Sequence, residues 1–281
     1  MKKHIPNLIT CLNVTSGALA IYMAFNGNLL IAAWLVILAM VFDFFDGFAA
    51  RLLHVKSDMG KELDSLADMV SFGVMPAVMA YFLIRETFCS FAPGETYYWV
   101  ERVLSVVPLL VPAFSAYRLA KFNLDTRQTH SFIGLPTPSN ALFWVMLVFC
   151  FYYQPEFFKT TWGNPWLLAG CSFVLALLLI SEVPMFSLKL TNFSWKENSL
   201  LYCFVSTIMI GFAVWGVKAL TWMIPVYVLI SCHGYRKNYN WMIFWGIVLL
   251  LLWAMRQEAL FIIIPAYLIV VIVRLTSRSN Q

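Results

Sequence analysis

Four aspartates stand in or beside strongly apolar segments, where an ionised carboxylate is costly. Asp43 and Asp46 lie in the run VFDFFDGFAAR, and Asp64 and Asp68 lie in the run GKELDSLADMV. On insertion scales, an ionised carboxylate in the middle of a bilayer costs about 2.5–3.5 kcal/mol. Four uncompensated carboxylates would cost about 10 kcal/mol, which is comparable to the stability of a whole domain. The sequence therefore requires counterions for these charges.

The spacing of the aspartates predicts that they face one another. Asp43 and Asp46 are three residues apart and Asp64 and Asp68 are four apart, so each pair lies on one face of a helix. The connection between the two segments is short and basic, so the helices are antiparallel neighbours and both pairs lie at similar depth. Four carboxylates match two divalent cations in charge, and oxygen ligands suit Mg²⁺ or Mn²⁺. We therefore predict that these four residues bind two ions of Mg²⁺ or Mn²⁺.

Small residues and one arginine accompany the aspartates. Gly47 follows the first pair and Gly60 precedes Asp64 by one turn, so a ligand can approach the backbone closely at both glycines. Arg51 lies one turn after Gly47 and places a planar cation beside the predicted metals. Two metals, an arginine and glycine clearance suit the binding of a pyrophosphate. A lone carboxylate such as Asp58 is, by contrast, typical of an interfacial residue or a helix cap.

The elements that position these residues are predicted to be membrane-spanning helices. Of the 281 residues, 61% are hydrophobic and 12% are charged, whereas soluble domains carry about a quarter charged residues. Apolar runs long enough to cross a bilayer recur along the whole sequence. They predict an all-α polytopic membrane protein, with spans near residues 7–25, 29–50, 62–84, 99–117, 138–153, 165–185, 199–217, 219–233, 240–255 and 258–275.

The distribution of basic residues predicts the orientation. With the N-terminus in the cytoplasm and ten alternating spans, most of the 19 Lys and Arg residues lie in cytoplasmic segments. Both aspartate pairs then lie at the cytoplasmic side of the inner membrane. We interpret the net charge of +5 as this topology signal, aided by anionic membrane lipids, and predict no nucleic-acid partner. The six cysteines lie mostly in apolar runs without C-x-x-C spacing, which is typical of buried free thiols.

The segment from residue 43 to residue 68 also carries a specific string of residues. It reads D-x-x-D-G-x-x-A-R, then eight residues, then G-x-x-x-D-x-x-x-D. This string resembles the signature of the CDP-alcohol phosphotransferase family at every fixed position. The resemblance implies a six-helix core, two divalent metals, CDP-diacylglycerol as a CDP-linked donor lipid, and CMP as the leaving product. We expect this core to occupy residues 1–190 and two to four additional transmembrane helices to occupy residues 191–281.

The resemblance implies roles for individual residues. All four aspartates match metal-binding positions, and Asp68 also matches the position of the general base. The N-terminal run PNLIT resembles a family element that lies near the donor nucleotide. The residues that match or adjoin donor-binding positions are Asn7, Thr10, Gly47, Arg51, Ser57 and Gly60.

Further segments resemble the branch of the family that uses L-serine as the acceptor. They are residues 118–123 (RLAKFN) and 134–138 (GLPTP), and Asn13 and Gly17 also match this branch. Lys121 stands where the branch more often has arginine, and a positively charged cytoplasmic loop also accounts for this residue. The residues expected to contact the acceptor are Arg118, Lys121 and Asn123.

The implied reaction converts CDP-diacylglycerol and L-serine into phosphatidylserine and CMP. The nearest alternative is the same chemistry with glycerol 3-phosphate, an inositol phosphate or choline as the acceptor. A phosphorylated acceptor would require more basic residues beside the metals than the stretch at 118–127 supplies. A divalent-cation transporter is a further alternative, but it predicts ionisable residues at several depths, whereas the aspartates cluster at one side and Glu182 is isolated. We also allow for a homodimer.

Overall fold

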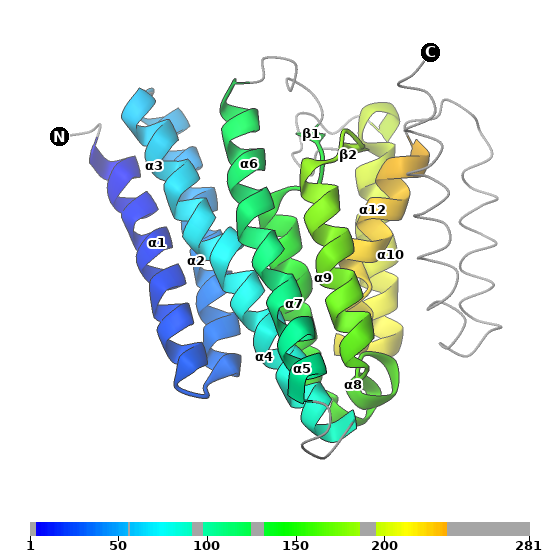
Figure 1. Ribbon diagram of the computed structural model, residues 1–281. Helices are drawn as coiled ribbons and strands as arrows, with labels where there is room; N and C mark the ends of the chain where they lie inside the picture. The colour runs from blue at the N-terminus through cyan, green and yellow to red at the C-terminus, as the bar shows by residue number, and fades with distance from the viewer. Residues whose placement is uncertain (1–3, 56, 92–97, 125–131, 186–194, 235–281) are drawn as a thin grey trace, which may run out of the picture. The chain divides into compact units, whose positions relative to one another are not determined.

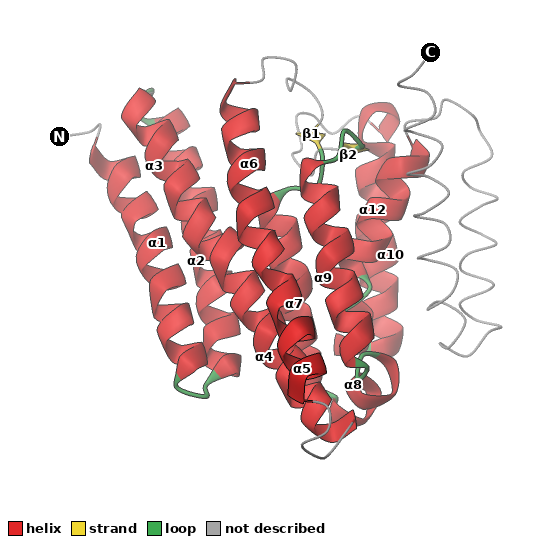
Figure 2. Cartoon of the chain, viewed as in Figure 1, coloured by secondary structure: helices red, strands yellow, loops and turns green. Residues whose placement is uncertain are grey.

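The computed structural model describes residues 4–55, 57–91, 98–124, 132–185 and 195–234. In this part of the chain the structure is helical, apart from one pair of two-residue strands (Figure 2). The chain divides into two compact units: Met1–Gln128 with Leu135–Ser181, and Thr129–Gly134 with Glu182–Gln281. The expectation of an all-α protein is confirmed for the described residues, and the division into domains at residue 190 stays a prediction.

The first unit begins with a hairpin of two long apolar helices, α1 (His4–Phe25) and α2 (Leu29–Leu52). Small buried residues, including Ala20, Ala32 and Ala39, line the surfaces of these helices and allow close packing between them. The turn between them contains Gly27 with a φ of 79°, a conformation that glycine adopts at little cost. The hairpin places the start of α1 beside the end of α2, which carries Asp43 and Asp46 (Figure 1).

The third long helix carries the second aspartate pair. It consists of α3 (Asp58–Asp68), the π-helical segment η1 (Met69–Val74) and α4 (Met75–Phe91). Ser57 caps its start, because the Ser57 Oγ accepts a hydrogen bond from the Gly60 backbone N–H at 3.0 Å. The continuous helix Asp58–Ser90 is 33 residues long, so it extends beyond the predicted span at 62–84 at both ends. The π-helical segment was not predicted, because a local change in helical period leaves no reliable pattern in the sequence.

The remaining helices of the first unit follow in antiparallel order. The next span combines α5 (Tyr98–Val106), a 3₁₀ turn η3 (Val107–Leu109) at Pro108, and α6 (Leu110–Leu124). The last elements are α7 (Thr137–Tyr153), α8 (Pro155–Thr161) and α9 (Pro165–Ile180), and α8 and α9 are bent by 77° relative to each other. The predicted span at 165–185 was too long at its C-terminal end, and the short helix α8 was not predicted.

The second unit contains the strands and the later helices. Strand β1 (Phe132–Ile133) pairs antiparallel with β2 (Pro184–Met185). The helices are α10 (Trp195–Trp215), α11 (Val217–Leu220) and α12 (Met223–Gly234). The chain leaves α10 at Gly216, which has a φ of 60°. The predicted spans at 240–255 and 258–275 lie outside the described residues.

Several helices have the length and composition of membrane spans. Within the described ranges, four helices are long and apolar enough to cross a membrane, or five if the bent pair α8–α9 is one span. Helix α7 is apolar but has 17 residues, which is just below that length. These helices are consistent with an integral, multi-pass membrane protein. The orientation of the helices relative to the cytoplasm stays a prediction.

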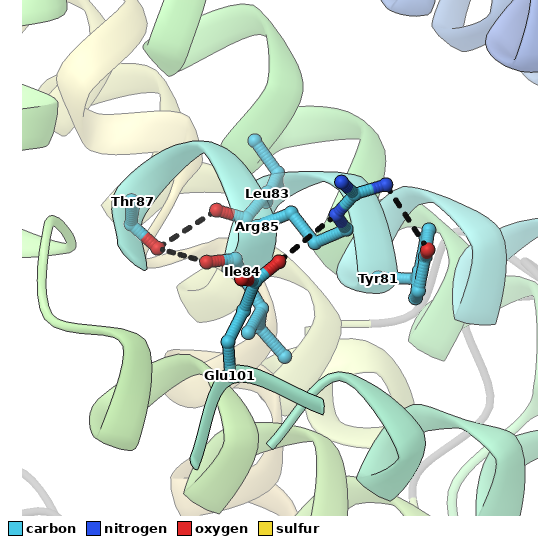
Figure 3. A network of polar contacts seen from close by, with 6 residues as sticks. All are labelled: Tyr81, Leu83, Ile84, Arg85, Thr87 and Glu101. Atoms are coloured by element: carbon cyan, nitrogen blue, oxygen red, sulfur yellow. Dashed lines mark hydrogen bonds and ion pairs between the residues drawn. The ribbon is translucent and has the colours of Figure 1, made fainter. Parts of the chain in front are cut away.

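A polar network joins α4 to α5 near the far end of the first unit from the aspartates (Figure 3). The Arg85 Nε donates to the Glu101 Oε1 at 3.1 Å, and the Arg85 Nη1 donates to the Tyr81 hydroxyl at 3.2 Å. In the same view the Thr87 hydroxyl donates to backbone carbonyls of its own helix. The Arg85 side chain is half-exposed, and exposed ion pairs contribute at most about 1 kcal/mol. We interpret this network as a structural tie between the helices.

Candidate functional site

Three carboxylates from α2 and α3 converge in the first unit. Asp43, Asp64 and Asp68 each place a carboxylate oxygen within 4.8 Å of the corresponding oxygens of the other two, and all three residues are partly buried. Oxygens bound to one Mg²⁺ at about 2.1 Å lie at most about 4.2 Å apart, so small side-chain movements would bring all three onto one ion. The Asp68 Oδ1 is buried and has no hydrogen-bond partner among the described residues. This all-oxygen group therefore fits a divalent cation of the Mg²⁺ type.

Asp46 occupies a different position from the other three aspartates. It is buried, and its Oδ2 accepts a hydrogen bond of 2.7 Å from the Thr10 hydroxyl on α1. Its carboxylate is still close enough to Asp64 and Asp68 to interact electrostatically with both. Helix α1 thus orients Asp46 at the edge of the three-carboxylate group. The predicted role of Asp46 as a metal ligand stays a prediction, as does the predicted contact of Thr10 with the donor.

Arg118 supplies a cation beside the carboxylates. This residue lies on α6 with only 7% of its surface exposed, and its guanidinium interacts electrostatically with the Asp68 carboxylate. The guanidinium carbon lies 5.8 Å from the centre of the Phe122 ring, a distance at which the ring attracts a cation. The structure therefore brings the first of the three predicted acceptor residues to the aspartate group.

The other two predicted acceptor residues lie further along α6. The Asn123 Nδ2 donates to the Ser65 Oγ at 2.9 Å, and the Lys61 Nζ donates to the Asn123 carbonyl oxygen at 2.7 Å. These contacts tie the end of α6 to α3, which carries Asp64 and Asp68. Lys121 is half-buried in the same last turn of α6. The contacts of Asn123 support a positioning role for this residue, and the sequence pattern alone did not indicate it.

Most of the predicted donor-binding residues gather where α1 and α3 begin. A Cβ atom placed on Gly60 would lie 3.0 Å from the Ser57 Oγ and 3.2 Å from the Asn7 Oδ1, so these three residues are in close contact. Gly47 has open space around it. Arg51 is exposed, and its Nε donates to the Gly47 carbonyl at 3.0 Å. The donor-binding roles of all these residues stay predictions.

The segment η1 lies directly below the carboxylates and packs against α1, α6 and α7. The Ser71 hydroxyl in η1 donates to the Asn13 carbonyl oxygen on α1 at 3.1 Å. Gly17 also approaches η1, because a Cβ atom on this glycine would lie 2.9 Å from the Ser71 Cα. Ser71 and η1 were not predicted from the sequence, and Asn13 and Gly17 were distinguished only by the family resemblance.

We expect Gly17→Ala to destabilise the first unit. The added methyl would overlap the backbone of Ser71, and overpacking of this kind costs about 1–3 kcal/mol. The measurement is thermal unfolding of the purified protein in detergent, with a lower Tm expected for the variant. The matched control is Gly170→Ala on α9, where a Cβ atom would meet no heavy atom within 4 Å and no loss is expected. Equal Tm values for the two variants would contradict the close approach of α1 and η1.

The sequence is similar to one protein family and to several named enzymes. Residues 3–190 match the CDP-alcohol phosphatidyltransferase family. A CDP-diacylglycerol–serine O-phosphatidyltransferase of Helicobacter pylori is 31% identical over 207 residues, covering 73% of this chain and 81% of that protein. A protein of the same name from Bacillus subtilis is 36% identical over 182 residues, covering 64% and 88%. An archaetidylserine synthase of Methanothermobacter thermautotrophicus is 34% identical over 143 residues, covering 49% and 54%.

Proposed function

The chain belongs to the CDP-alcohol phosphatidyltransferase family, and we propose that it transfers the phosphatidyl group of CDP-diacylglycerol to the hydroxyl of L-serine. The products are phosphatidylserine and CMP. The observation that carries this proposal is the convergence of Asp43, Asp64 and Asp68 beside the buried guanidinium of Arg118. The names of the relatives from Helicobacter pylori and Bacillus subtilis support serine as the acceptor.

The transfer forms one bond at phosphorus and breaks another. The serine hydroxyl oxygen attacks the lipid-side phosphorus of the pyrophosphate, and the bond from that phosphorus to the bridging oxygen breaks. The electron pair of the broken bond remains on the phosphate of the departing CMP. Divalent ions held by the aspartates would neutralise the pyrophosphate and the charge that develops on CMP. Thr10 contributes by holding Asp46 in place beside these carboxylates.

Asp68 is the residue that we assign as the general base. Its Oδ1 is buried and has no hydrogen-bond partner within the described part of the chain, so one oxygen of this carboxylate can accept a proton while the other contributes to the metal group. As the new bond forms, Asp68 takes the proton of the serine hydroxyl. Arg118 lies within electrostatic range of Asp68 and is positioned to bind the serine carboxylate while the hydroxyl reaches the phosphorus.

Arg118→Ala should raise the KM for serine far more than the KM for CDP-diacylglycerol. Loss of a buried, charge-assisted hydrogen bond to the serine carboxylate corresponds to a change of about tenfold to a hundredfold in affinity. The measurement is CMP release with each substrate varied in turn. Lys121→Ala is the control, because Lys121 is less buried than Arg118, and its KM for serine should change less. Equal increases for both substrates would instead assign Arg118 to the donor phosphates.

The proposed acceptor is tested by a panel of alcohols. Purified protein with CDP-diacylglycerol and Mg²⁺ or Mn²⁺ should release CMP rapidly with L-serine and slowly with glycerol 3-phosphate, an inositol phosphate or choline. Consumption of glycerol 3-phosphate in place of serine would overturn the acceptor assignment. The family membership and the carboxylate group would not be affected by that result.

We also propose that the aspartates face the cytoplasm of the inner membrane and that the first six spans form the catalytic core. Cytoplasmic placement is supported by the distribution of basic residues and by the solubility of serine. Met59 lies beside the donor residues and is exposed. In a background without native cysteines, Met59→Cys should react with an impermeant maleimide in inside-out vesicles and not in intact cells. The reverse pattern would contradict the orientation.

A further inference from the structure

Three fully buried polar side chains lie on helices near the carboxylates and have no role in the proposed transfer. They are Asn13 on α1, Ser115 on α6 and Asn140 on α7, and each has 0% of its surface exposed. Among the described residues, neither side-chain atom of the two carboxamides, nor the Ser115 hydroxyl, has a hydrogen-bond partner. A buried polar group left unpaired costs about 1–3 kcal/mol. A fold that keeps two such asparagines needs a partner for them.

Contacts between the helices define the depth of Asn13 and Ser115. The hydrogen bond from Ser71 to the Asn13 carbonyl places Asn13 level with the middle of η1. Asp68 lies three residues before Ser71, so Asn13 is about one helical turn deeper than Asp68. Ser115 lies at a similar depth, because a Cβ atom on Gly73 would be 3.2 Å from the Ser115 Cβ.

The depth of Asn140 follows from an aromatic contact between α2 and α7. The rings of Trp34 on α2 and Phe149 on α7 have centres 4.8 Å apart, which sets the register of these two antiparallel helices. Asp43 lies nine residues after Trp34, and Asn140 lies nine residues before Phe149. At the same rise per residue, both positions are about 13 Å from the aromatic contact. Asn140 is therefore level with Asp43, and α7 packs against both α2 and η1.

We propose that Asn13 and Asn140 bind the charged groups of the amino-acid acceptor and thereby determine acceptor specificity. A carboxamide donates through its Nδ2 to a carboxylate and accepts through its Oδ1 from an ammonium group, so it suits a zwitterion. With Arg118 bound to the acceptor carboxylate, these uncharged carboxamides add hydrogen bonds that suit a zwitterion, whereas a phosphorylated alcohol would require further cations. This inference rests on the proposed function, and it adds two residues that recognise the amino acid, Asn140 at the level of the carboxylates and Asn13 about one turn below them.

The first test uses Asn13→Leu and Asn140→Leu, which keep the number and branching of the side-chain heavy atoms and remove the unpaired polar atoms. Each variant should raise the KM for serine by about tenfold or more, because hydrogen bonds to a charged ligand are lost. The KM for CDP-diacylglycerol should change by less than about threefold, because the donor does not contact these residues in the proposal. The Tm without substrate should stay equal or rise, because leucine needs no partner. A lower Tm with an unchanged KM for serine would show a structural role and overturn the proposal.

A matched pair of serine variants controls for buried hydroxyls in general. Ser115 and Ser105 are both buried, with hydroxyls that lack partners within the described ranges, but Ser105 lies on α5, away from η1. Ser115→Ala should raise the KM for serine, and Ser105→Ala should leave it unchanged. Similar KM values for the two variants would show that the Ser115 hydroxyl does not bind the acceptor.

A binding measurement separates this inference from the proposed function. Added L-serine, with a divalent ion and a CDP-linked donor analogue that cannot react, should raise the Tm of the wild-type protein. The same addition should raise the Tm of the asparagine variants much less. No shift in the wild-type protein would overturn the proposed function itself. A full shift in Asn13→Leu and Asn140→Leu would overturn only the assignment of these residues.

Discussion

Asp68→Asn should reduce the release of CMP at saturating substrates by about a hundredfold to ten-thousandfold, which is the usual contribution of a general base. An asparagine keeps the shape of the side chain and cannot accept the serine proton. Because Asp68 is also one of the three converging carboxylates, a smaller loss of donor affinity is expected as well. The measurement is single-turnover CMP release, together with binding of CDP-diacylglycerol.

The control for this variant is Asp58→Asn. Asp58 lies in the first turn of the same helix and is exposed, so its substitution should leave turnover close to the wild-type value. Near-normal turnover in Asp68→Asn would exclude Asp68 as the base. A large loss in Asp58→Asn would show instead that the whole of α3 responds to any change of charge.

Removal of divalent ions is the second change with a large expected effect. Treatment with EDTA should abolish CMP release, and addition of Mg²⁺ or Mn²⁺ should restore it, because Asp43, Asp64 and Asp68 place like charges within 4.8 Å of one another and their repulsion requires a cation. In Asp64→Asn, restoration should require a higher concentration of the ion. Full activity of the wild-type protein in metal-free buffer would contradict the metal site.

Helical periodicity was sufficient to predict the carboxylate group. The spacing of Asp43 and Asp46 on one helix and of Asp64 and Asp68 on the next, with the short connection between the helices, predicted that the two pairs face each other. The structure brings Asp43, Asp64 and Asp68 together. The apolar runs also predicted α1 and α2 to within a few residues of their bounds. Both results depend on regular helices, in which sequence spacing translates directly into a face and a depth.

Contacts between distant helices could not be predicted in the same way. The hydrogen bond between Thr10 and Asp46 spans 36 residues of sequence, and nothing in the spacing separates Asp46 from the other aspartates. The π-helical segment η1 changes the period within one helix, and the buried Asn140 follows Thr137 and Ser139 at the start of α7, where polar residues are ordinary for a helix end. Such features depend on which helices pack against each other, and the residue pattern within one helix does not show its packing partners.

In the proposed reaction, the serine hydroxyl oxygen attacks the lipid-side phosphorus of CDP-diacylglycerol beside Asp43, Asp64 and Asp68. The most direct test supplies L-serine labelled with ¹⁸O in its hydroxyl group, together with unlabelled CDP-diacylglycerol, Mg²⁺ or Mn²⁺ and the purified protein. Mass spectrometry should find the label in the phosphate ester of phosphatidylserine and none in CMP. Phosphatidylserine without the label, or CMP that carries it, would contradict the proposed attack, and labelled serine recovered unchanged while CMP is released would exclude serine as the acceptor.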